Sequence, residues 1–386
     1  MPRSTIFFLL ILTIIASALG YNYFARPFSN YQAAQIELTE LIPEEEENNS
    51  ESAEETFSDQ DLAQLIAFPY SLDDNQSTQS ASLSWIKLNQ PGLITLFGSK
   101  VSTAAAKIAT DKISSSFDDE SEPLIAVDHE GGSVQRLSGS GFTSLPSWKS
   151  ICAAGSTQRQ DLLSASAQEL SRAGVDLVFA PVIDIASQSA ILKDRICSSN
   201  PETVIARATE FIDIFAQQKI IPVIKHYPGI GSTSRDLHFS FDEVNLKEEE
   251  ILVFKDILEE YPLIGVMSAH VGVKDRYEDE PCSLNVDCID DLTGFFPGVI
   301  VFTDALDMDS AGYAGEDKEL IILAERAVSA IKAGNNVLVF GPNIELGEFD
   351  EVIAALKTAY ELDEDFQKQA QQSIKKIRQY KEVLKK

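Results

Sequence analysis

The segment "IIPVIKHYPG" (220–229) begins with apolar residues and ends in charged and turn-forming ones. A continuous apolar run of this kind, without the alternation of a half-exposed strand, is typical of a strand buried on both faces of a parallel sheet. Lys225 and His226 stand directly where the apolar run stops. The segment therefore predicts a buried parallel strand that delivers polar side chains at its carboxyl end.

Seven further segments repeat this pattern. They are "QLIAFPY" (64–70), "GLITLFG" (92–98), "LIAVDHE" (124–130), "DLVFAPVID" (176–184), "LIGVMSAHV" (263–271), "GVIVFTDAL" (298–306) and "NNVLVFGP" (335–342). Helical patterns separate most of them, for example one that begins at Pro201 and one that ends at Gly334. The weakest unit is the gap between the first two runs, where "SASLSWIKL" is the candidate helix.

Eight strand–helix units predict an α/β fold, a (β/α)8 TIM-like barrel that forms a single catalytic domain. A doubly wound open sheet is the competing fold. That fold usually carries a Gly-x-Gly-x-x-Gly turn after its first strand, and the sequence has none there. We therefore assign residues 61–386 to the barrel domain, with a helix at its C-terminal end.

The first 60 residues have a different character. Residues 1–24 combine a basic start at Arg3, an apolar run from Ile6 and small residues at 16–18, the layout of a secretory signal peptide. An uncleaved N-terminal membrane anchor is the alternative. Residues 25–60 are rich in acids and predict a disordered acidic linker. In both cases we expect an exported protein: periplasmic, extracellular or membrane-anchored.

Charge and cysteine content narrow the functional classes. A net charge of −29 disfavours nucleic acid as a partner. The four cysteines are too few and too scattered to indicate a disulfide scaffold, and no C-x-x-C pair indicates zinc. We expect packed thiols, with a Cys282–Cys288 bond as the alternative in an oxidising compartment.

Polar side chains stand at the ends of five predicted strands. Asp128 ends the third, Asp184 the fourth, Lys225 and His226 the fifth, His270 the sixth and Asp304 the seventh. In a (β/α)8 barrel the carboxyl ends of the strands meet on one face, where the chemistry gathers. Charged groups at the tips of apolar strands are costly unless they are paired or used. The sequence therefore predicts one shared polar pocket.

The residues of this pocket could serve three kinds of chemistry. A Ser-His-Asp triad would use Ser232 or Ser234 near His238, but no Gly-x-Ser-x-Gly elbow follows a strand. A metal site from His226, His270 and Asp128 lacks a recognisable ligand spacing. Carboxylates surrounded by Lys and Arg instead suit a ligand rich in hydroxyls and the cationic transition state of glycoside cleavage. We expect no metal and no cofactor.

Five motifs extend this interpretation, because their residues and order resemble glycoside hydrolase family 3, in its single-domain β-N-acetylglucosaminidase branch. They are "AVDHEGGSVQRL" (126–137), "GVDLVFAPVIDI" (174–185), "KHYPGIGSTSRDLH" (225–238), "PCSLN" (281–285) and "VFTDALDM" (301–308). The resemblance implies that Asp304 is the catalytic nucleophile and that Asp236 and His238 form the general acid/base pair. It places His238 on a mobile loop after the fifth strand, where an imidazole can give and take a proton near neutral pH.

The resemblance also implies a set of sugar-binding residues: Asp128, Arg136, Arg195, Lys225 and His226. It implies that Asp184 and His270 support them, and we expect Glu130 to turn into the structure rather than toward the substrate. The alternatives are that Asp304 caps a helix, that Arg195 forms an ordinary salt bridge and that His238 is an exposed, dispensable histidine.

The sequence departs from the family pattern at a few positions. The family commonly reads Lys-His-Phe-Pro-Gly-His-Gly-Asp-Thr, whereas Ile230 replaces the second His and Ser232 the Asp. "FSFDEV" follows His238 in place of a Leu-rich segment, and Ser198 stands where Gly is typical. These changes concern rate and substrate preference more than fold.

Three functional hypotheses follow. The first is a retaining exo-glycosidase that removes terminal β-linked N-acetylglucosamine from peptidoglycan or chitin-type fragments. The second is a β-glycoside phosphorylase or β-glucosidase of the same family. The third is a non-catalytic sugar-binding protein of the cell envelope. An oligosaccharide or glycan is the expected partner in each case, with N-terminal membrane association where the segment 1–24 is retained.

Overall fold

Eight short parallel strands form the centre of the computed structural model, which describes residues 57–117, 121–277, 279–313 and 320–385. They are β1 (Ile66–Ser71), β2 (Leu93–Phe97), β3 (Leu124–Val127), β6 (Leu177–Val178), β7 (Ile221–Tyr227), β9 (Gly265–Ser268), β11 (Ile300–Thr303) and β12 (Leu338–Val339). Their order in the sheet is β11-β9-β7-β6-β3-β2-β1-β12. Each strand lies within one of the eight apolar runs or overlaps it closely, so the predicted strands are confirmed.

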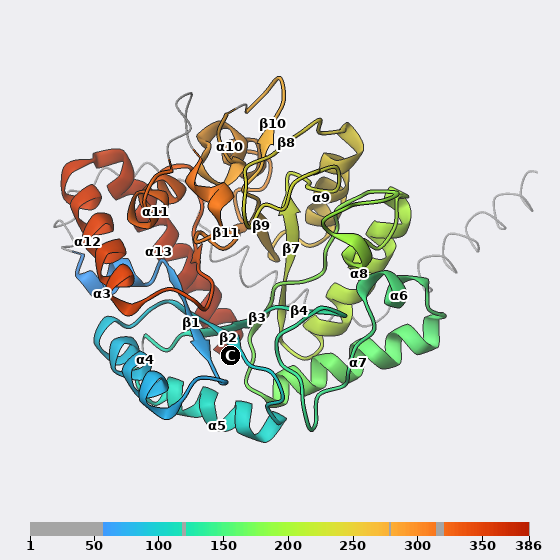
Figure 1. Ribbon diagram of the computed structural model, residues 1–386, viewed down its shortest axis with the longest axis horizontal. Coiled ribbons are helices and arrows are strands. Elements are labelled where there is room, and N and C mark those ends of the chain that lie inside the picture. Colours follow the sequence, from blue (N-terminus) through green and yellow to red (C-terminus); the bar gives the residue numbers. More distant parts are fainter. Residues whose placement is uncertain (1–56, 118–120, 278, 314–319, 386) are drawn as a thin grey trace, which may run out of the picture.

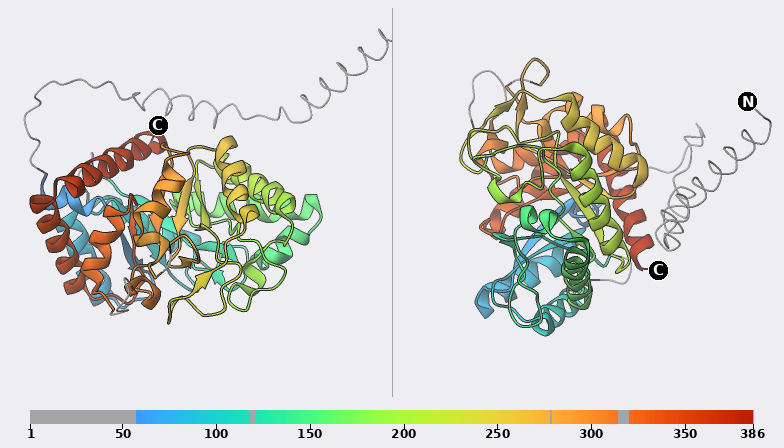
Figure 2. Two further views of the ribbon diagram at one scale, coloured as in Figure 1. Left: turned by 90° about the horizontal axis from the view of Figure 1, so that it is seen from above. Right: turned by 90° about the vertical axis from the view of Figure 1, so that its right-hand side faces the viewer.

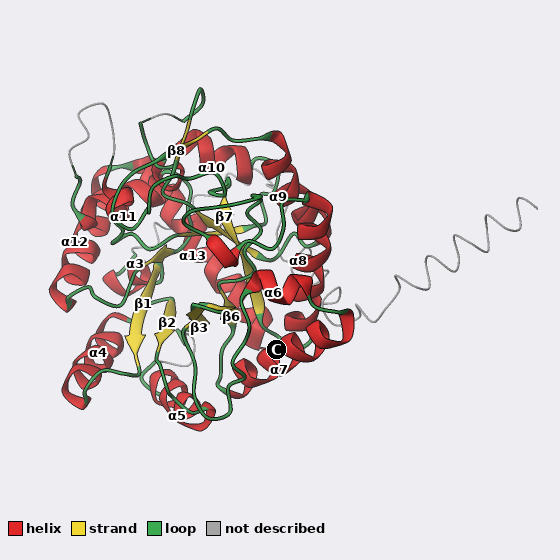
Figure 3. Cartoon of the chain, turned by 45° about the vertical axis from the view of Figure 1, so that its right-hand side comes forward, coloured by secondary structure: helices red, strands yellow, loops and turns green. Residues whose placement is uncertain are grey.

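The sheet closes between its two outer strands. Phe302 of β11 forms a parallel bridge with Val337, just before β12, and the N–H of Asn336 donates to the carbonyl of Val301 at 2.7 Å. Inside the barrel, Phe179 and Phe302 meet edge-on with ring centroids 5.8 Å apart. The predicted (β/α)8 barrel is therefore confirmed, and Figure 3 shows the helices around the strands.

Helices follow most strands and cover the outside of the barrel (Figure 1). The α-helices are α3 (Asp59–Ala63), α4 (Gln76–Asn89), α5 (Thr103–Ser114), α6 (Trp148–Ala153), α7 (Ser156–Arg172), α8 (Pro201–Ala216), α9 (Glu248–Glu260), α10 (Val286–Thr293), α11 (Leu323–Lys332), α12 (Leu346–Leu362) and α13 (Glu364–Lys385). Short 3₁₀ helices are η1 (Lys193–Arg195), η2 (Cys282–Leu284) and η3 (Asp309–Gly312). Two-residue and three-residue strands pair outside the barrel: β4 (His129–Gly131) with β5 (Val134–Gln135), and β8 (Glu243–Val244) with β10 (Gly272–Val273).

Local sequence explains where two of these helices begin. α8 starts at Pro201, as predicted, and the side chain of Asn200 accepts a hydrogen bond from the N–H of Thr203 at 2.8 Å. The weakly patterned gap between the first two strands is filled by α4, which Asn75 caps in the same way. The first unit therefore also consists of a strand followed by a helix.

The last helix crosses the amino ends of the strands. The Lys376 ammonium donates to the carbonyl of Val299 at 2.8 Å, and the Tyr380 hydroxyl donates to the carbonyl of Leu263 at 2.9 Å. Val299 precedes β11 and Leu263 precedes β9. The C-terminal stretch is thus two helices, α12 and α13, and α13 lies against the face opposite the carboxyl ends of the strands (Figure 2).

The predicted signal or anchor (1–24) and nearly all of the predicted linker (25–60) lie outside the described residues. α3 begins at Asp59, inside the segment 25–60, and the side chain of Ser58 caps it. Within the part of the chain that the structure describes, no helix combines the length and apolar character needed to cross a bilayer.

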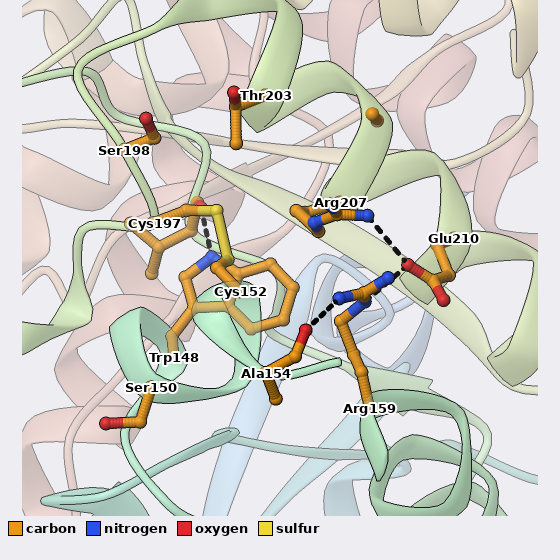
Figure 4. Close-up of a disulfide and its surroundings, with 12 residues drawn as sticks. Trp148, Ser150, Cys152, Ala154, Arg159, Cys197, Ser198, Thr203, Arg207 and Glu210 are labelled. Carbon is orange, nitrogen blue, oxygen red and sulfur yellow. Dashed lines mark hydrogen bonds and ion pairs between the residues drawn. A yellow bond between two sulfur atoms is a disulfide. The ribbon is translucent and has the colours of Figure 1, made fainter. Parts of the chain in front are cut away.

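The cysteines correct the expectation of packed thiols. Cys152 is bonded to Cys197, and Cys282 is bonded to Cys288. The first bond joins residues 45 positions apart, a pairing that spacing alone cannot reveal. Its two cysteines follow β3 and β6, which are neighbours in the barrel, so the fold brings them together (Figure 4).

Candidate active site

A cavity of about 410 Å³ lies at the carboxyl ends of the barrel strands. All eight side chains that the sequence analysis assigned to catalysis or sugar binding line it: Asp128, Arg136, Arg195, Lys225, His226, Asp236, His238 and Asp304. They come from the ends of β3, β7 and β11 and from the loops that follow β5, β6 and β7. The barrel therefore gathers residues up to 176 positions apart, Asp128 and Asp304 at the extremes, around one space.

Glu130 organises the cations of this cavity. Its carboxylate accepts hydrogen bonds from the Lys225 ammonium at 2.6 Å and from the Arg195 guanidinium at 2.8 and 2.9 Å. Lys225 also donates to Asp128 at 2.7 Å. Burial raises the pKa of Glu130, but Lys225 and Arg195 outweigh this effect and lower it to about 2. Two carboxylates thus balance two cations.

His226 is fixed from both sides of its ring. Nδ1 lies 2.7 Å from Asp184, and Nε2 lies 3.2 Å from Nη2 of Arg195. Because a guanidinium can only donate, Nε2 must accept, and Nδ1 carries the proton that is donated to Asp184. Asp184 also accepts the backbone N–H of Ile230 at 2.7 Å. It therefore supports both the His226 ring and the start of the following loop.

Asp304 follows β11 and faces the cavity. Its N–H donates to the carbonyl of Ser268 at 2.9 Å, and its carboxylate accepts the N–H of Ala305 at 2.8 Å. Burial raises the pKa of Asp304, but His226, His270, the Ala305 N–H and Lys225 together lower it. The next helical segment is η3, whose cap position is Met308. Asp304 is therefore an ionised cavity carboxylate rather than a helix cap.

His270 supports the backbone next to Asp304. Its Nε2 donates to the carbonyl of Ala305 at 3.0 Å, and its Nδ1 lies 2.6 Å from the hydroxyl of Ser283. The ring is fully buried, and burial lowers its pKa despite the opposing effect of Asp304. A neutral ring with the proton on Nε2 fits both contacts, because Ser283 can then donate to Nδ1.

Asp236 and His238 form a pair on the loop between β7 and β8. Nδ1 of His238 lies 2.8 Å from the Asp236 carboxylate, which also accepts the backbone N–H of His238 at 3.0 Å. Burial raises the pKa of Asp236, but these hydrogen bonds outweigh it and lower the pKa. The His238 side chain is 63% exposed. Because Asp236 engages Nδ1, proton transfer would use Nε2.

The loop that carries this pair rests on the segment after Asp304. The N–H of Asp309 donates to the carbonyl of His238 at 3.2 Å, and the N–H of Ser310 donates to the carbonyl of Leu237 at 3.3 Å. At the base of the loop, the Asp242 carboxylate accepts the N–H of Ser234 at 2.6 Å. The Asp236–His238 pair and the carboxylate of Asp304 therefore belong to two segments that contact each other.

Sequence reasoning missed the apolar walls and the pairing of Glu130. The apolar lining includes Phe97, Ile191, Leu192, Met267, Met308 and Phe340. Some of these residues end the predicted strands, but the sequence does not show which strand-end side chains turn inward. The Glu130 side chain is 1% exposed, but it also lines the cavity, and its two cationic partners come from other units of the barrel.

The structure also places the residues that depart from the family pattern and those of the alternative metal set. Ile230, which replaces a histidine of the family pattern, is buried and lines the cavity, whereas Ser232 is exposed. The metal set His226, His270 and Asp128 has other partners, as described above. Among the described residues, no group of three or more His, Cys, Asp or Glu side chains is arranged to hold a metal ion.

Known proteins resemble this chain in sequence and in fold. The β-hexosaminidase of Tolumonas auensis is 35% identical over 227 residues, which cover 56% of this chain and 65% of that protein. The β-hexosaminidase of Photobacterium profundum is 35% identical over 58% of this chain and 66% of that protein. The matches thus span just under two thirds of these relatives. Among solved structures, the β-N-acetylhexosaminidase of Beutenbergia cavernae superimposes with a TM-score of 0.72 at 23% identity, covering 83% of this chain and 98% of that one.

A second solved structure, a glycoside hydrolase family 3 β-N-acetylglucosaminidase from Paenibacillus, has a TM-score of 0.70 at 22% identity, covering 85% of this chain and 63% of that one. At these identities the structures support the barrel fold. The family model described as the glycosyl hydrolase family 3 N-terminal domain matches residues 42–377. The chain therefore belongs to glycosyl hydrolase family 3.

Proposed function

We propose that this protein is a retaining exo-β-N-acetylglucosaminidase that removes terminal β-linked N-acetylglucosamine from peptidoglycan or chitin-type fragments. One observation carries the proposal: the ionised carboxylate of Asp304 and the Asp236–His238 pair line the same cavity. Retaining glycosidases need a nucleophile and a proton donor that face one glycosidic bond. The relatives named β-hexosaminidase support N-acetylglucosamine as the sugar.

In the first step the sugar is held by its hydroxyl groups. Asp128, Arg136, Arg195, Lys225 and His226 would bind them through charge-assisted hydrogen bonds. Asp304 then attacks the anomeric carbon, and the bond from that carbon to the leaving-group oxygen breaks.

His238 supplies the proton to that oxygen as the bond breaks. The carboxylate of Asp236 stabilises the charged ring before transfer and keeps Nδ1 occupied, so that Nε2 delivers the proton. The products of this step are the released alcohol or sugar and an ester between Asp304 and the N-acetylglucosamine.

In the second step water replaces the enzyme on the sugar. The neutral His238 ring accepts a proton from the water as its oxygen attacks the anomeric carbon, and the ester bond to Asp304 breaks. Two displacements at one carbon restore the β configuration. Arg195 and Lys225 remain bound to Glu130 throughout. They position the sugar, and His238 carries out both proton transfers.

The acceptor in the second step defines the alternative function. A histidine does not repel phosphate as a second carboxylate would, so a phosphorylase could use the same groups. The comparison is direct: release of nitrophenol from 4-nitrophenyl N-acetyl-β-glucosaminide and from the β-glucoside, each with and without phosphate. We expect the N-acetylglucosaminide to be preferred and phosphate to have little effect. A phosphate-dependent rate with sugar 1-phosphate as product would favour the phosphorylase.

The Asp304→Asn variant tests the nucleophile. We expect its turnover to fall by several orders of magnitude while circular dichroism and thermal unfolding remain close to those of the wild type. A 2-fluoro or 5-fluoro sugar should label the peptide that contains Asp304. Undiminished turnover in the variant would remove the assignment, and sugar binding without turnover by the wild type would favour a non-catalytic sugar-binding protein.

We also propose that the protein is exported, with residues 1–24 as signal peptide or membrane anchor. The two disulfides support this proposal, because such bonds persist in oxidising compartments and are rare in the cytosol. The test is fractionation of cells that express the full chain with a C-terminal tag. Recovery of the tagged chain in the cytosol with free thiols would contradict the proposal, and release by detergent rather than by salt would indicate an anchor.

A further inference from the structure

The Cys152–Cys197 disulfide joins helix α6 to the loop that carries Arg195. Cys197 follows Arg195 by two residues, and the loop connects β6 to α8. We propose that this disulfide positions Arg195 for sugar binding, so that the strength of substrate binding depends on the oxidation state of the bond. The inference rests on the proposed function for the role of Arg195 and adds a positioning pair, Cys152 and Cys197, outside the cavity.

Helix α6 provides a fixed base for the bond. The indole N–H of Trp148 donates to the carbonyl of Val182 at 2.9 Å, four residues after β6, where Val182 forms a bridge with Lys225 of β7. The Trp148 ring also meets Phe211 of α8 edge-on. At the other end of α6, the carbonyl of Ala154 accepts a hydrogen bond from Arg159 of α7 at 2.6 Å (Figure 4). Cys152 therefore belongs to a short helix that is bonded to the start of the β6–α8 connection, where it pairs with β7, and contacts two neighbouring helices.

The loop with Cys197 is organised mainly by local hydrogen bonds. The hydroxyl of Ser189 accepts the N–H of Leu192 at 3.0 Å, and the carbonyl of Leu192 accepts the N–H of Arg195 at 2.8 Å. Leu192 and Ile196, on either side of Arg195, are buried in the core, and the disulfide adds a covalent attachment to α6. The side chain of Arg195 reaches Glu130, and the disulfide attaches the backbone two residues further on.

A second cavity, of about 560 Å³, lies against the same loop. Lys149 of α6 lines one part of it, and the loop residues Gln188, Lys193, Cys197 and Ser198 line another. Open space therefore lies between the loop and α6 over part of their length. The disulfide joins the two elements at the edge of this space, which Cys197 lines with 8% of its surface exposed.

Loss of the bond would free the loop to move into this space. Arg195 would then sample several positions relative to Glu130. The conformational entropy lost when it is held in one position would weaken sugar binding. We expect KM to rise roughly tenfold, about the effect of weakening one charge-assisted hydrogen bond. The turnover number should change far less, because the nucleophile and the acid/base pair lie on other segments.

The first experiment is a thermodynamic cycle on the full chain with 4-nitrophenyl N-acetyl-β-glucosaminide. The variants are Cys152→Ser with Cys197→Ser, Arg195→Ala, and all three substitutions together. If the disulfide acts through Arg195, its removal raises KM in the wild-type background and adds little to the Arg195→Ala variant. The same factor in both backgrounds, or no change in either, would overturn the proposal, since a merely stabilising bond gives additive effects.

Reversible reduction gives a second, independent readout. Treatment of the wild type with a phosphine reductant should raise KM, and reoxidation should restore it. The matched control is the double serine variant under the same treatment, because any further change there belongs to the Cys282–Cys288 bond. A wild-type KM that does not respond to verified reduction of Cys152 and Cys197 would count against the proposal. If the double variant does not fold, a variant with Cys282→Ser and Cys288→Ser takes its place, because reduction then acts on the Cys152–Cys197 bond alone.

Hydrogen–deuterium exchange separates failure of this inference from failure of the proposed function. Reduction should speed amide exchange in residues 187–199 and leave α8 unchanged, whether or not the protein hydrolyses the substrate. If the wild type shows no turnover but the loop responds, the proposed function fails and the attachment of the loop stands. Unchanged exchange in residues 187–199 would refute the positioning role directly.

Discussion

Substitution of Glu130 by Gln would test the charge network beneath the cavity. The wild-type carboxylate accepts hydrogen bonds from both Lys225 and Arg195, and its side chain is 1% exposed. Glutamine has nearly the same shape, but its amide carries one acceptor oxygen and an NH₂ group that must face a cation. The variant therefore leaves Lys225, which is 3% exposed, with Asp128 as its remaining ion-pair partner.

The expected loss of stability follows from the pKa of Glu130. Its fall from 4.5 to about 2 corresponds to roughly 3 kcal/mol of stabilisation of the folded state at neutral pH, at about 1.4 kcal/mol per pKa unit. Removal of one partner from a buried ion pair costs a similar amount, about 3–5 kcal/mol. Because the folded-state pKa is lowered, this stabilisation is complete above about pH 4.5 and is lost as the pH falls toward 2.

The measurement is urea unfolding of wild type and variant at pH 7 and at pH 3. We expect the variant to be less stable by roughly 3 kcal/mol at pH 7 and the difference to shrink at pH 3. We also expect kcat/KM to fall, because Arg195 loses its anchor. The control is Glu169→Gln, a buried carboxylate bonded to Thr143 outside the cavity, which should keep kcat/KM. Equal stability of Glu130→Gln and wild type at pH 7 would refute the reasoning.

Three further predictions concern the reacting groups. His238→Ala should slow substrates with poor leaving groups by roughly 10²–10⁴-fold and activated aryl glycosides far less; equal slowing of both would exclude an acid role. Gly231→Ala should lower kcat/KM by roughly 100-fold, because the new Cβ would lie 2.2 Å from the carbonyl oxygen of Ile185 and displace the His238 loop. Gly347→Ala, whose Cβ meets nothing within 4 Å, is its control. Finally, the pKa of Asp304 is lowered from 3.8. The decrease in kcat/KM at acidic pH should therefore have its midpoint below pH 3.8. A midpoint above pH 5 would contradict the proposal that Asp304 is ionised in the resting enzyme.

The barrel could be predicted from the sequence because buried parallel strands have a simple residue pattern. Both faces of such a strand are buried, so each appears as a short apolar run, and the polar residue after it marks the rim of the barrel. Asp128 and Asp304 were visible for this reason. The position of a residue at a strand end says that it reaches the rim, and several such residues together indicate a pocket.

Features that depend on contacts between distant units were not visible. Glu130 stands three residues after the end of β3, and nothing nearby in the sequence indicates Lys225 and Arg195 as its partners. The pairing of Cys152 with Cys197 depends on β3 and β6 being neighbours. The path of α13 across the amino ends of the strands likewise depends on backbone carbonyls that any sequence provides, such as that of Val299.

The charge arrangement supports the proposed role of Asp304 as a nucleophile that stays ionised. Lys225 and Arg195 are held at hydrogen-bond distance by Glu130 and Asp128, so their short contacts are already used. They still act on Asp304 through space, as Asp304 raises the pKa of Arg195 and Lys225 lowers the pKa of Asp304. A direct salt bridge would keep Asp304 charged but would also weaken the attack on the anomeric carbon that we propose. A carboxylate stabilised at longer range, with one hydrogen bond from the N–H of Ala305, would keep its charge for the cationic centre that the proposed reaction forms on the sugar.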